Sequence, residues 1–178
     1  MTGDASGIRT RRWSAPHETV EYMASQATLN AVKDAGISKV DQLVVARDLI
    51  ATRRAYSLGL PIMQELEKNG IDVSDCSSVD LCNYCPGFVH GTNIAQLMVR
   101  SGQAKNVVVV ASTNYTEMVN TDGSFNGQFG DSFDSTKPLV SQYSLDSEGQ
   151  FQPPALNAFL WGCGAGAIVI GETEEERI

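Results

Sequence analysis

Two cysteines, Cys82 and Cys85, follow a short apolar run and precede a Pro-Gly pair in the sequence VDLCNYCPGFVHG (79–91). A helix that begins near Phe88 places Cys85 at its N-terminal end, with Pro86 at the first helical position. Unpaired backbone N–H groups and the positive end of the helix dipole favour the thiolate form of a cysteine at such a place. A thiolate is the nucleophile that takes an acyl group from a thioester. The pattern therefore predicts that Cys85 is a covalent acyl carrier.

The C-x-x-C spacing of Cys82 and Cys85 leaves a second interpretation open, a metal or redox site with Cys76 as a third thiol. A zinc site of the usual kind needs a second C-x-x-C or a histidine pair, and the sequence has neither. We therefore expect no metal and interpret Cys76, Cys82 and Cys163 as inert, buried small residues. His90 lies in the same helix as Cys85, and we interpret it as structural or pocket-lining.

Around these residues the chain alternates between helical and strand patterns. Helices are predicted over 18–34, 57–69 and 87–101. Strands are predicted over 42–46, 78–82, 106–112 and 165–172. The valine run at 107–110 does not alternate with polar residues, which is typical of a parallel strand covered on both faces. The alternation indicates an α/β/α layered fold with a mostly parallel mixed sheet.

The helical periodicity also predicts which residues face inward. The first helix places Val20, Met23, Ala24, Ala27 and Ala31 at helical spacing, and the third places Val89, Ile94, Leu97 and Met98 mostly inward. Gly36 and Gly70 are expected to cap the ends of the first two helices. Pro61 is expected in the first turn of the second helix or at a kink.

Composition limits the class of protein. The 178 residues carry a net charge of −8, which argues against nucleic acid as the main partner. No apolar run reaches the length of a membrane span, and the N-terminus lacks a signal-peptide core, so we expect a cytoplasmic protein without membrane contact. We expect one domain over 1–178, with a long polar insertion at about 120–157.

Four motifs in order resemble the N-terminal half of β-ketoacyl-ACP synthase III, a member of the thiolase-like superfamily. GIRTRR (7–12) resembles the family's GI-x-x-R motif, and DAGISKVDQLVVA (34–46) resembles its DAGI segment. The block at 79–112 resembles the active-cysteine region, with Cys85 on the nucleophile. WGCGAGAIVI (161–170) resembles the family's glycine loop and following strand.

The resemblance implies that Cys85 accepts an acyl group from acyl-CoA or an acyl carrier protein, and that a malonyl-type thioester then condenses with it. The backbone N–H of Cys85 would help to hold the oxyanion. No cofactor is implied beyond these thioester substrates. The substrate-binding residues would be Arg9, Tyr56, Gly162, Gly164 and Gly166.

Departures from the family pattern shape the remaining expectations. The family's catalytic His and Asn lie in a C-terminal half that these 178 residues do not include. The family's first edge strand precedes GI-x-x-R, and we expect it to be missing here, because the sequence reaches Gly7 almost at once. Cys163 stands where the family has an acidic residue. We therefore expect a second chain or fragment that supplies the His and Asn, in a dimer of such units with the loop near 54–57 at the interface. The alternatives are a subunit that is non-catalytic, and one that transfers acyl groups to oxygen or nitrogen.

Overall fold

The structure is a computed structural model, and it describes residues 12, 14–15, 17–47, 57–83, 85–114 and 162–172. Its contacts divide the chain into two units, Met1–Pro16 with Asn114–Gly164, and His17–Thr113 with Ala165–Ile178. The second unit holds the helices and nearly all of the sheet. The elements are α2 (Val20–Asp34), β1 (Gln42–Arg47), α3 (Gly59–Lys68), β2 (Ser77–Leu81), α4 (Gly87–Arg100), β3 (Asn106–Thr113) and β4 (Gly164–Gly171).

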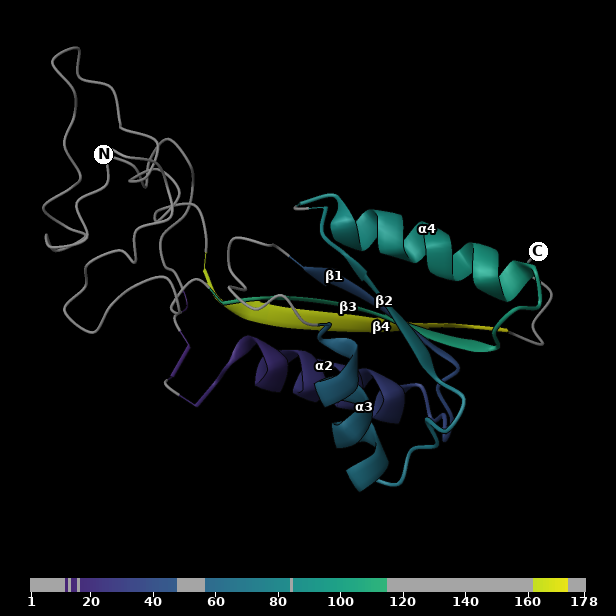
Figure 1. Ribbon diagram of the computed structural model, residues 1–178, viewed down its shortest axis with the longest axis horizontal. Coiled ribbons are helices and arrows are strands. Elements are labelled where there is room, and N and C mark those ends of the chain that lie inside the picture. The colour runs from purple at the N-terminus through teal and green to yellow at the C-terminus, as the bar shows by residue number, and fades with distance from the viewer. Residues whose placement is uncertain are drawn as a thin grey trace, which may run out of the picture. The chain divides into compact units, whose positions relative to one another are not determined.

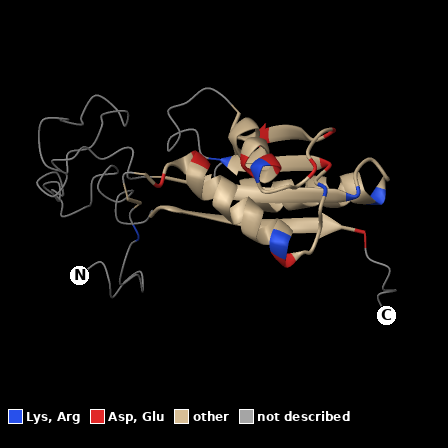
Figure 2. Ribbon diagram, turned by 90° about the horizontal axis from the view of Figure 1, so that it is seen from below, with Lys and Arg blue, Asp and Glu red and all other residues tan. Residues whose placement is uncertain are grey.

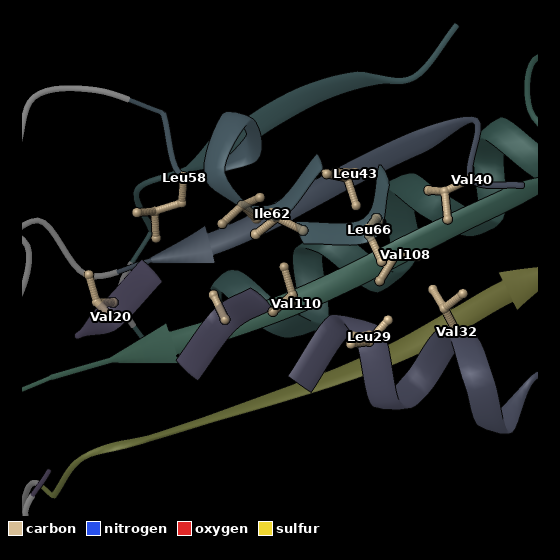
Figure 3. Packing of buried hydrophobic residues seen from close by; sticks show 12 residues of the cluster. Val20, Leu29, Val32, Val40, Leu43, Leu58, Ile62, Leu66, Val108 and Val110 are labelled. Carbon is tan, nitrogen blue, oxygen red and sulfur yellow. The ribbon is translucent and has the colours of Figure 1, made fainter. Parts of the chain in front are cut away.

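The four strands form one sheet in the order β2-β1-β3-β4. Strand β1 pairs in parallel with β2 on one side and with β3 on the other. The arrows of β3 and β4 point in opposite directions in Figure 3, and a Cβ on Gly171 at the end of β4 would lie 3.3 Å from Asn106 Oδ1 at the start of β3. Helices α2 and α3 cover one face and α4 covers the other (Figure 1). The predicted α/β/α layering and mostly parallel mixed sheet are confirmed.

Two apolar clusters hold these layers together. Successive side chains of a strand point to opposite faces of the sheet, so the valine run of β3 serves both clusters. Val108 and Val110 pack with residues of α2 and α3 (Figure 3). Val107 and Val109 pack with residues of α4 instead. All four valines are fully buried, which explains why their run shows no polar alternation.

Helix α2 ends at residue 34 as its sequence predicts, but it begins two residues later than predicted and its buried face is turned. Thr19 is the N-cap, and its Oγ1 accepts a hydrogen bond from the backbone N–H of Tyr22 at 3.2 Å. Leu29 and Val32 are buried, whereas the predicted Ala27 and Ala31 are only partly covered. Burial of a leucine or a valine removes more apolar area from water than burial of an alanine, so the larger side chains set the rotation of the helix.

Both predicted glycine caps are present. Gly36 has a φ of 65° and Gly70 a φ of 78°, values that side chains disfavour and glycine tolerates. Gly36 N–H donates to Lys33 O at 3.1 Å, and Gly70 N–H donates to Glu67 O at 2.9 Å. Pro61 lies in the first turn of α3, which begins at Gly59. These caps explain why the helix ends could be placed from the sequence.

Helix α4 corrects the prediction for two residues. Ile94 and Met98 pack against the sheet as expected, but Val89 is 60% exposed and Leu97 is 66% exposed. The fully buried residues of the helix are small, namely Gly87, Gly91 and Ala95. Helical periodicity alone favours the large apolar residues as the buried ones, so it missed this face.

The described part of the chain carries both acidic and basic residues. Acidic and basic positions are interspersed, many of them near the ends of helices and in turns (Figure 2). Among the residues that the structure describes, no helix is both long and apolar enough to cross a membrane.

The predicted insertion at 120–157 and the expected loss of a first edge strand lie outside the described residues. The assignment of one domain stays a prediction.

Candidate active site around Cys85

The turn between β2 and α4 presents Cys85 at the start of a helix. Strand β2 ends at Leu81, and α4 begins at Gly87 with Pro86 as its N-cap. The helix thus begins one residue before the predicted Phe88, and Pro86 lies one position before the predicted first helical residue. The side chain of Cys85 is exposed. A reagent in solution can therefore reach the thiol.

The start of α4 is suited to a negative charge. The N-cap makes no side-chain hydrogen bond, and the first turn holds no acidic residue. The first N–H groups of a helix have no partner within the helix, and the helix dipole is positive at that end. These features favour an oxyanion that forms next to the helix start.

Two glycines bring α4 very close to the sheet. A Cβ on Gly87 would lie 3.3 Å from the Cβ of Ala46 at the end of β1. A Cβ on Gly91, one turn later, would lie 3.0 Å from Val109 Cγ1 and 3.1 Å from Val44 Cγ1. Because these gaps leave little room for a Cβ, the backbone of α4 packs directly against side chains of the sheet next to the Cys85 turn.

Two side chains from opposite sides of Cys85 in the sequence form a hydrogen bond with each other. Asn83 Nδ2 forms a short hydrogen bond with His90 Nδ1, and both residues are exposed. The contact links the residue two before Cys85 with the residue five after it. That His90 is structural or pocket-lining stays a prediction. No sequence motif pointed to Asn83 as its partner.

The carboxylate of Asp80 on β2 contacts residues of two other segments at the same end of the sheet. Asp80 Oδ2 lies 3.0 Å from Arg47 Nε, and both side chains are largely buried, with 12% and 7% of their areas exposed. Ser57 Oγ donates to Asp80 Oδ1 at 2.8 Å, and the backbone N–H of Leu58 donates to Asp80 Oδ2 at 3.2 Å. Leu58 is the N-cap of α3. Asp80 thus serves this helix as a cap from a neighbouring strand.

The predicted glycine loop is partly a strand. Strand β4 begins at Gly164, so Gly164 and Gly166 belong to the sheet and only Gly162 precedes it. Both strand glycines are exposed, and a Cβ on either would meet no described atom within 4 Å. The reason for the difference is that the segment Gly164–Gly171 is a strand of the sheet, where it is the neighbour of β3. Glycine inside a strand often marks a place where another molecule or backbone approaches.

In the first unit, the buried side-chain amide of Asn114 accepts two hydrogen bonds. Asn114 is 2% exposed, and its Oδ1 accepts from Ser14 Oγ at 2.8 Å and from Cys163 Sγ at 3.3 Å. The backbone N–H of Cys163 donates to the carbonyl of Arg12 at 2.9 Å. The thiol of Cys163 therefore acts as a hydrogen-bond donor within this unit.

Cys76 behaves differently from the cysteines of the turn. Burial, together with the negative charge of Asp41, raises the pKa of the Cys76 thiol to about 11. A thiol that resists ionisation is a poor nucleophile and a poor metal ligand. Within the described part of the chain, no group of three or more His, Cys, Asp or Glu residues is placed to hold a metal ion. The prediction that Cys82 is buried is wrong, because its side chain is exposed.

The remaining predicted site residues divide into two groups. Arg9 and Tyr56 lie outside the described residues. Gly162 and Gly164 belong to the first unit, whereas Cys85 and Gly166 belong to the second. The joining of these residues into one site therefore stays a prediction.

Comparison with known proteins gives this arrangement a family context. The family profile described as 3-oxoacyl-[acyl-carrier-protein (ACP)] synthase III matches residues 79–133, which include Cys85 and all of α4. A β-ketoacyl-[acyl-carrier-protein] synthase III of Vibrio vulnificus is 31% identical over 175 residues, covering 97% of this chain and 44% of the relative. A 3-oxopimeloyl-[acyl-carrier-protein] synthase of Brucella abortus is 35% identical over 115 residues, which cover 65% of this chain and 34% of that relative.

Solved structures agree with the sequence comparison. The priming β-ketosynthase of the R1128 polyketide biosynthetic pathway superposes with a TM-score of 0.66 and 27% identity, over 95% of this chain and 40% of that one. The fold is therefore that of part of a thiolase-like protein. The chain is similar to the N-terminal part of β-ketoacyl-ACP synthase III, as its four motifs predicted, and it spans about 44% of the length of the Vibrio vulnificus relative.

Proposed function

We propose that Cys85 is the nucleophile of an acyltransferase that forms an acyl-cysteine from an acyl-CoA or acyl-ACP thioester. The observation that carries the proposal is the exposed thiol directly before the uncapped start of α4. The thiolate attacks the thioester carbonyl, and the carbon–sulfur bond to the donor breaks, so the donor leaves as a free thiol. The backbone N–H of Cys85 stabilises the oxyanion that forms on the way.

The second half-reaction that we propose is a Claisen condensation. A malonyl-type thioester loses CO₂, and the electron pair left on its α-carbon attacks the carbonyl of the acyl-cysteine. A carbon–carbon bond forms, the bond from the carbonyl to Cys85 Sγ breaks, and the product is a 3-oxoacyl thioester. Support comes from relatives named as β-ketoacyl-ACP and 3-oxopimeloyl-ACP synthases. The same names favour an acyl carrier protein as a partner.

The condensation requires groups beyond these 178 residues, namely the His and Asn that the family resemblance implies. We propose that a further segment, in the same polypeptide or in a second chain, supplies them. The outward side of α4 supports this proposal, because Val89 and Leu97 are more than half exposed and lie eight residues apart on the helix. Apolar residues gathered on one exposed face indicate an interface. Arg9, Tyr56 and the glycines 162, 164 and 166 remain our candidates for substrate binding.

Three alternatives predict different behaviour of the thiol. A non-catalytic subunit would not need an accessible cysteine at the helix start, and a protein that transfers acyl groups to oxygen or nitrogen would form the acyl-cysteine without decarboxylating malonyl thioesters. A redox role for Cys82 and Cys85 would produce a disulfide in place of an acyl-enzyme. Trapping the acyl-enzyme distinguishes the acyl-transfer proposals from the others.

The test is intact-protein mass spectrometry after incubation with acetyl-CoA under reducing conditions. We expect one acetyl group per chain, mapped to the peptide that carries Cys85. The matched control is Cys82→Ala, which removes the other exposed thiol of the turn and should leave acetylation intact, whereas Cys85→Ala should abolish it. The proposal fails if acetyl-CoA and longer acyl-CoAs leave Cys85 unmodified while iodoacetamide alkylates it readily.

A further inference from the structure

The imidazole of His90 reaches back past the N-terminal end of its own helix. His90 is the fourth residue of α4, which begins at Gly87, yet its Nδ1 is hydrogen-bonded to Nδ2 of Asn83, which lies four residues before the helix. Side chains on a helix lean towards its N-terminus and cover the turn before their own Cα. The ring therefore lies beside residues 83–86, the turn that carries Cys85.

Cys85 and His90 occupy two related positions at this helix start. Pro86 is the N-cap, so Cys85 is the residue before the cap and His90 is the fourth residue after it. Residues at these two positions are the pair whose side chains pack together in a hydrophobic staple. Both side chains are exposed here. A thioester carbonyl that reaches the Cys85 thiol from solvent can therefore also come within reach of the imidazole.

The contact with Asn83 determines which nitrogen of the His90 ring carries a proton. An amide NH₂ group can only donate a hydrogen bond, so His90 Nδ1 accepts and has no proton of its own. A neutral imidazole of this kind carries its proton on Nε2. Among the described residues, none accepts a hydrogen bond from that nitrogen. His90 Nε2 is thus an available donor and not a base.

We propose that His90 donates a hydrogen bond from Nε2–H to the carbonyl oxygen of a thioester while Cys85 attacks its carbon. Asn83 is a positioning residue, because it acts on the substrate only by holding the ring of His90 in the donating tautomer. The role of His90 rests on the acyl transfer proposed above. The contact between Asn83 and His90 does not depend on that function.

The step that His90 assists can be written with every proton accounted for. The thiol of Cys85 gives its proton to water and its sulfur attacks the carbonyl carbon, so an electron pair moves to the carbonyl oxygen. Nε2–H then joins the backbone N–H of Cys85 as a donor to this oxyanion, at a helix start whose first turn holds no acidic residue. The oxyanion collapses, the bond to the leaving sulfur breaks, and the leaving thiolate takes a proton from water. His90 keeps its own proton throughout.

The first experiment tests the contact and is independent of acyl transfer. The chain has two histidines, and nitrogen NMR of the labelled rings reports which nitrogen of each one carries the proton. We expect His90 to carry its proton on Nε2. In Asn83→Ala the two nitrogen signals of His90 should shift towards each other, because both tautomers become populated. His17, whose ring packs edge-on against Tyr22, is the internal reference and should not change. A His90 proton on Nδ1, or signals that do not respond to Asn83→Ala, overturns the proposal.

The second experiment separates donation to an oxyanion from a general effect on the thiol. Attack on acetyl-CoA passes through an oxyanion, whereas alkylation by iodoacetamide displaces iodide and forms none. Both reactions are followed on Cys85 by mass spectrometry, in a Cys82→Ala background so that one thiol of the turn reacts. For His90→Ala we expect acetylation to slow about 10- to 100-fold, the effect of a lost hydrogen bond to a charged group. Alkylation should keep its rate.

Three further variants complete this test. His90→Gln retains a side-chain N–H donor and should recover most of the acetylation rate. Asn83→Ala should slow acetylation less than His90→Ala does, because the donating tautomer stays partly populated. His17→Ala is the matched control and should change neither reaction.

The outcomes distinguish this proposal from acyl transfer itself. If wild-type Cys85 is acetylated but His90→Ala reacts at the same rate, the role of His90 is overturned and acyl transfer stands. Equal slowing of acetylation and alkylation in His90→Ala also overturns that role, since it indicates a change in the thiol itself. If wild-type Cys85 accepts no acyl group, acyl transfer and the role of His90 fail together, while NMR still decides whether Asn83 holds the ring.

Discussion

Gly91 of α4 lies against Val109 of β3 so closely that a Cβ on the glycine would be 3.0 Å from Val109 Cγ1. Val44 of β1 is almost as near, at 3.1 Å. Both valines are fully buried in the apolar cluster beneath α4. The helix that follows the nucleophile therefore rests on two neighbouring strands with no side chain between them.

Replacement of Gly91 by alanine should destabilise the protein despite the better helix propensity of alanine. The propensity gain is about 0.5–1 kcal/mol, whereas overpacking of a filled core costs about 1–3 kcal/mol. We expect a net loss of about 1 kcal/mol in the free energy of unfolding, measured by urea denaturation. Asn93→Ala, at an exposed position of the same helix, is the control and should change stability little. A variant Gly91→Ala that is as stable as wild type would show that the helix can move away from the sheet.

Gly59 is a second glycine at which an added side chain would clash, and the neighbour that it would meet is Ser78. A Cβ there would lie 2.1 Å from Ser78 Oγ and 2.4 Å from Ser78 Cβ. Gly59→Ala should therefore lower the free energy of unfolding by about 2 kcal/mol or more. The double variant Gly59→Ala with Ser78→Gly removes the atoms in conflict and should recover part of the loss in the same denaturation experiment. Additive losses in the double variant would contradict the clash.

The exposed side of α4 should tolerate polar substitution in the isolated chain. Leu97 is 66% exposed, so Leu97→Ser removes little buried area and should change the free energy of unfolding by less than about 0.5 kcal/mol. If this side is covered by the segment that supplies His and Asn, the same change should weaken assembly at least about tenfold, since a buried leucine is worth about 1.5–3 kcal/mol. Isothermal titration with that segment measures the affinity, and Gln96→Ala on the same helix serves as control. Unchanged affinity would place the interface elsewhere.

Alkaline pH should reveal the environment of Cys76. Its pKa is raised to about 11 in the folded protein by burial and by Asp41, whereas an unfolded cysteine titrates near about 8.5. The raised value means that the neutral thiol stabilises the fold fully below about 8.5, and that this contribution is lost as pH rises towards about 11. Denaturation midpoints between these pH values should fall more steeply for wild type than for Cys76→Ala. Parallel curves would indicate that Cys76 is accessible to water in solution.

Much of the fold could be predicted from the sequence because its signals are local. The glycines at 36 and 70 end two helices at positive φ, and the valine run of β3 is buried on both faces as its pattern indicated. The position of Cys85 before a helix followed from the Pro-Gly pair. Each of these features depends on a few neighbouring residues.

The parts that were missed depend on contacts between distant segments. Val89 and Leu97 look like core residues by periodicity, but the sheet-facing positions of α4 are occupied by smaller residues, and this cannot be read without the partner strands. The role of Asp80 needs Arg47 and Ser57 to be brought together, and they lie 33 and 23 residues away in the sequence. A single aspartate in an apolar strand was the only signal, because a charge is seldom buried without a partner.

The contact of α4 with the sheet through Gly87 and Gly91 has an evolutionary consequence. Since a Cβ at either position would press on a side chain of the sheet, substitution there is expected to disturb the contact that holds the helix against the sheet. Heritable variation around Cys85 is thus directed to the opposite side of the helix, where Val89 is exposed. Descendants of such a protein can differ in the acyl chains that they accept while the position of the nucleophile relative to the sheet stays the same.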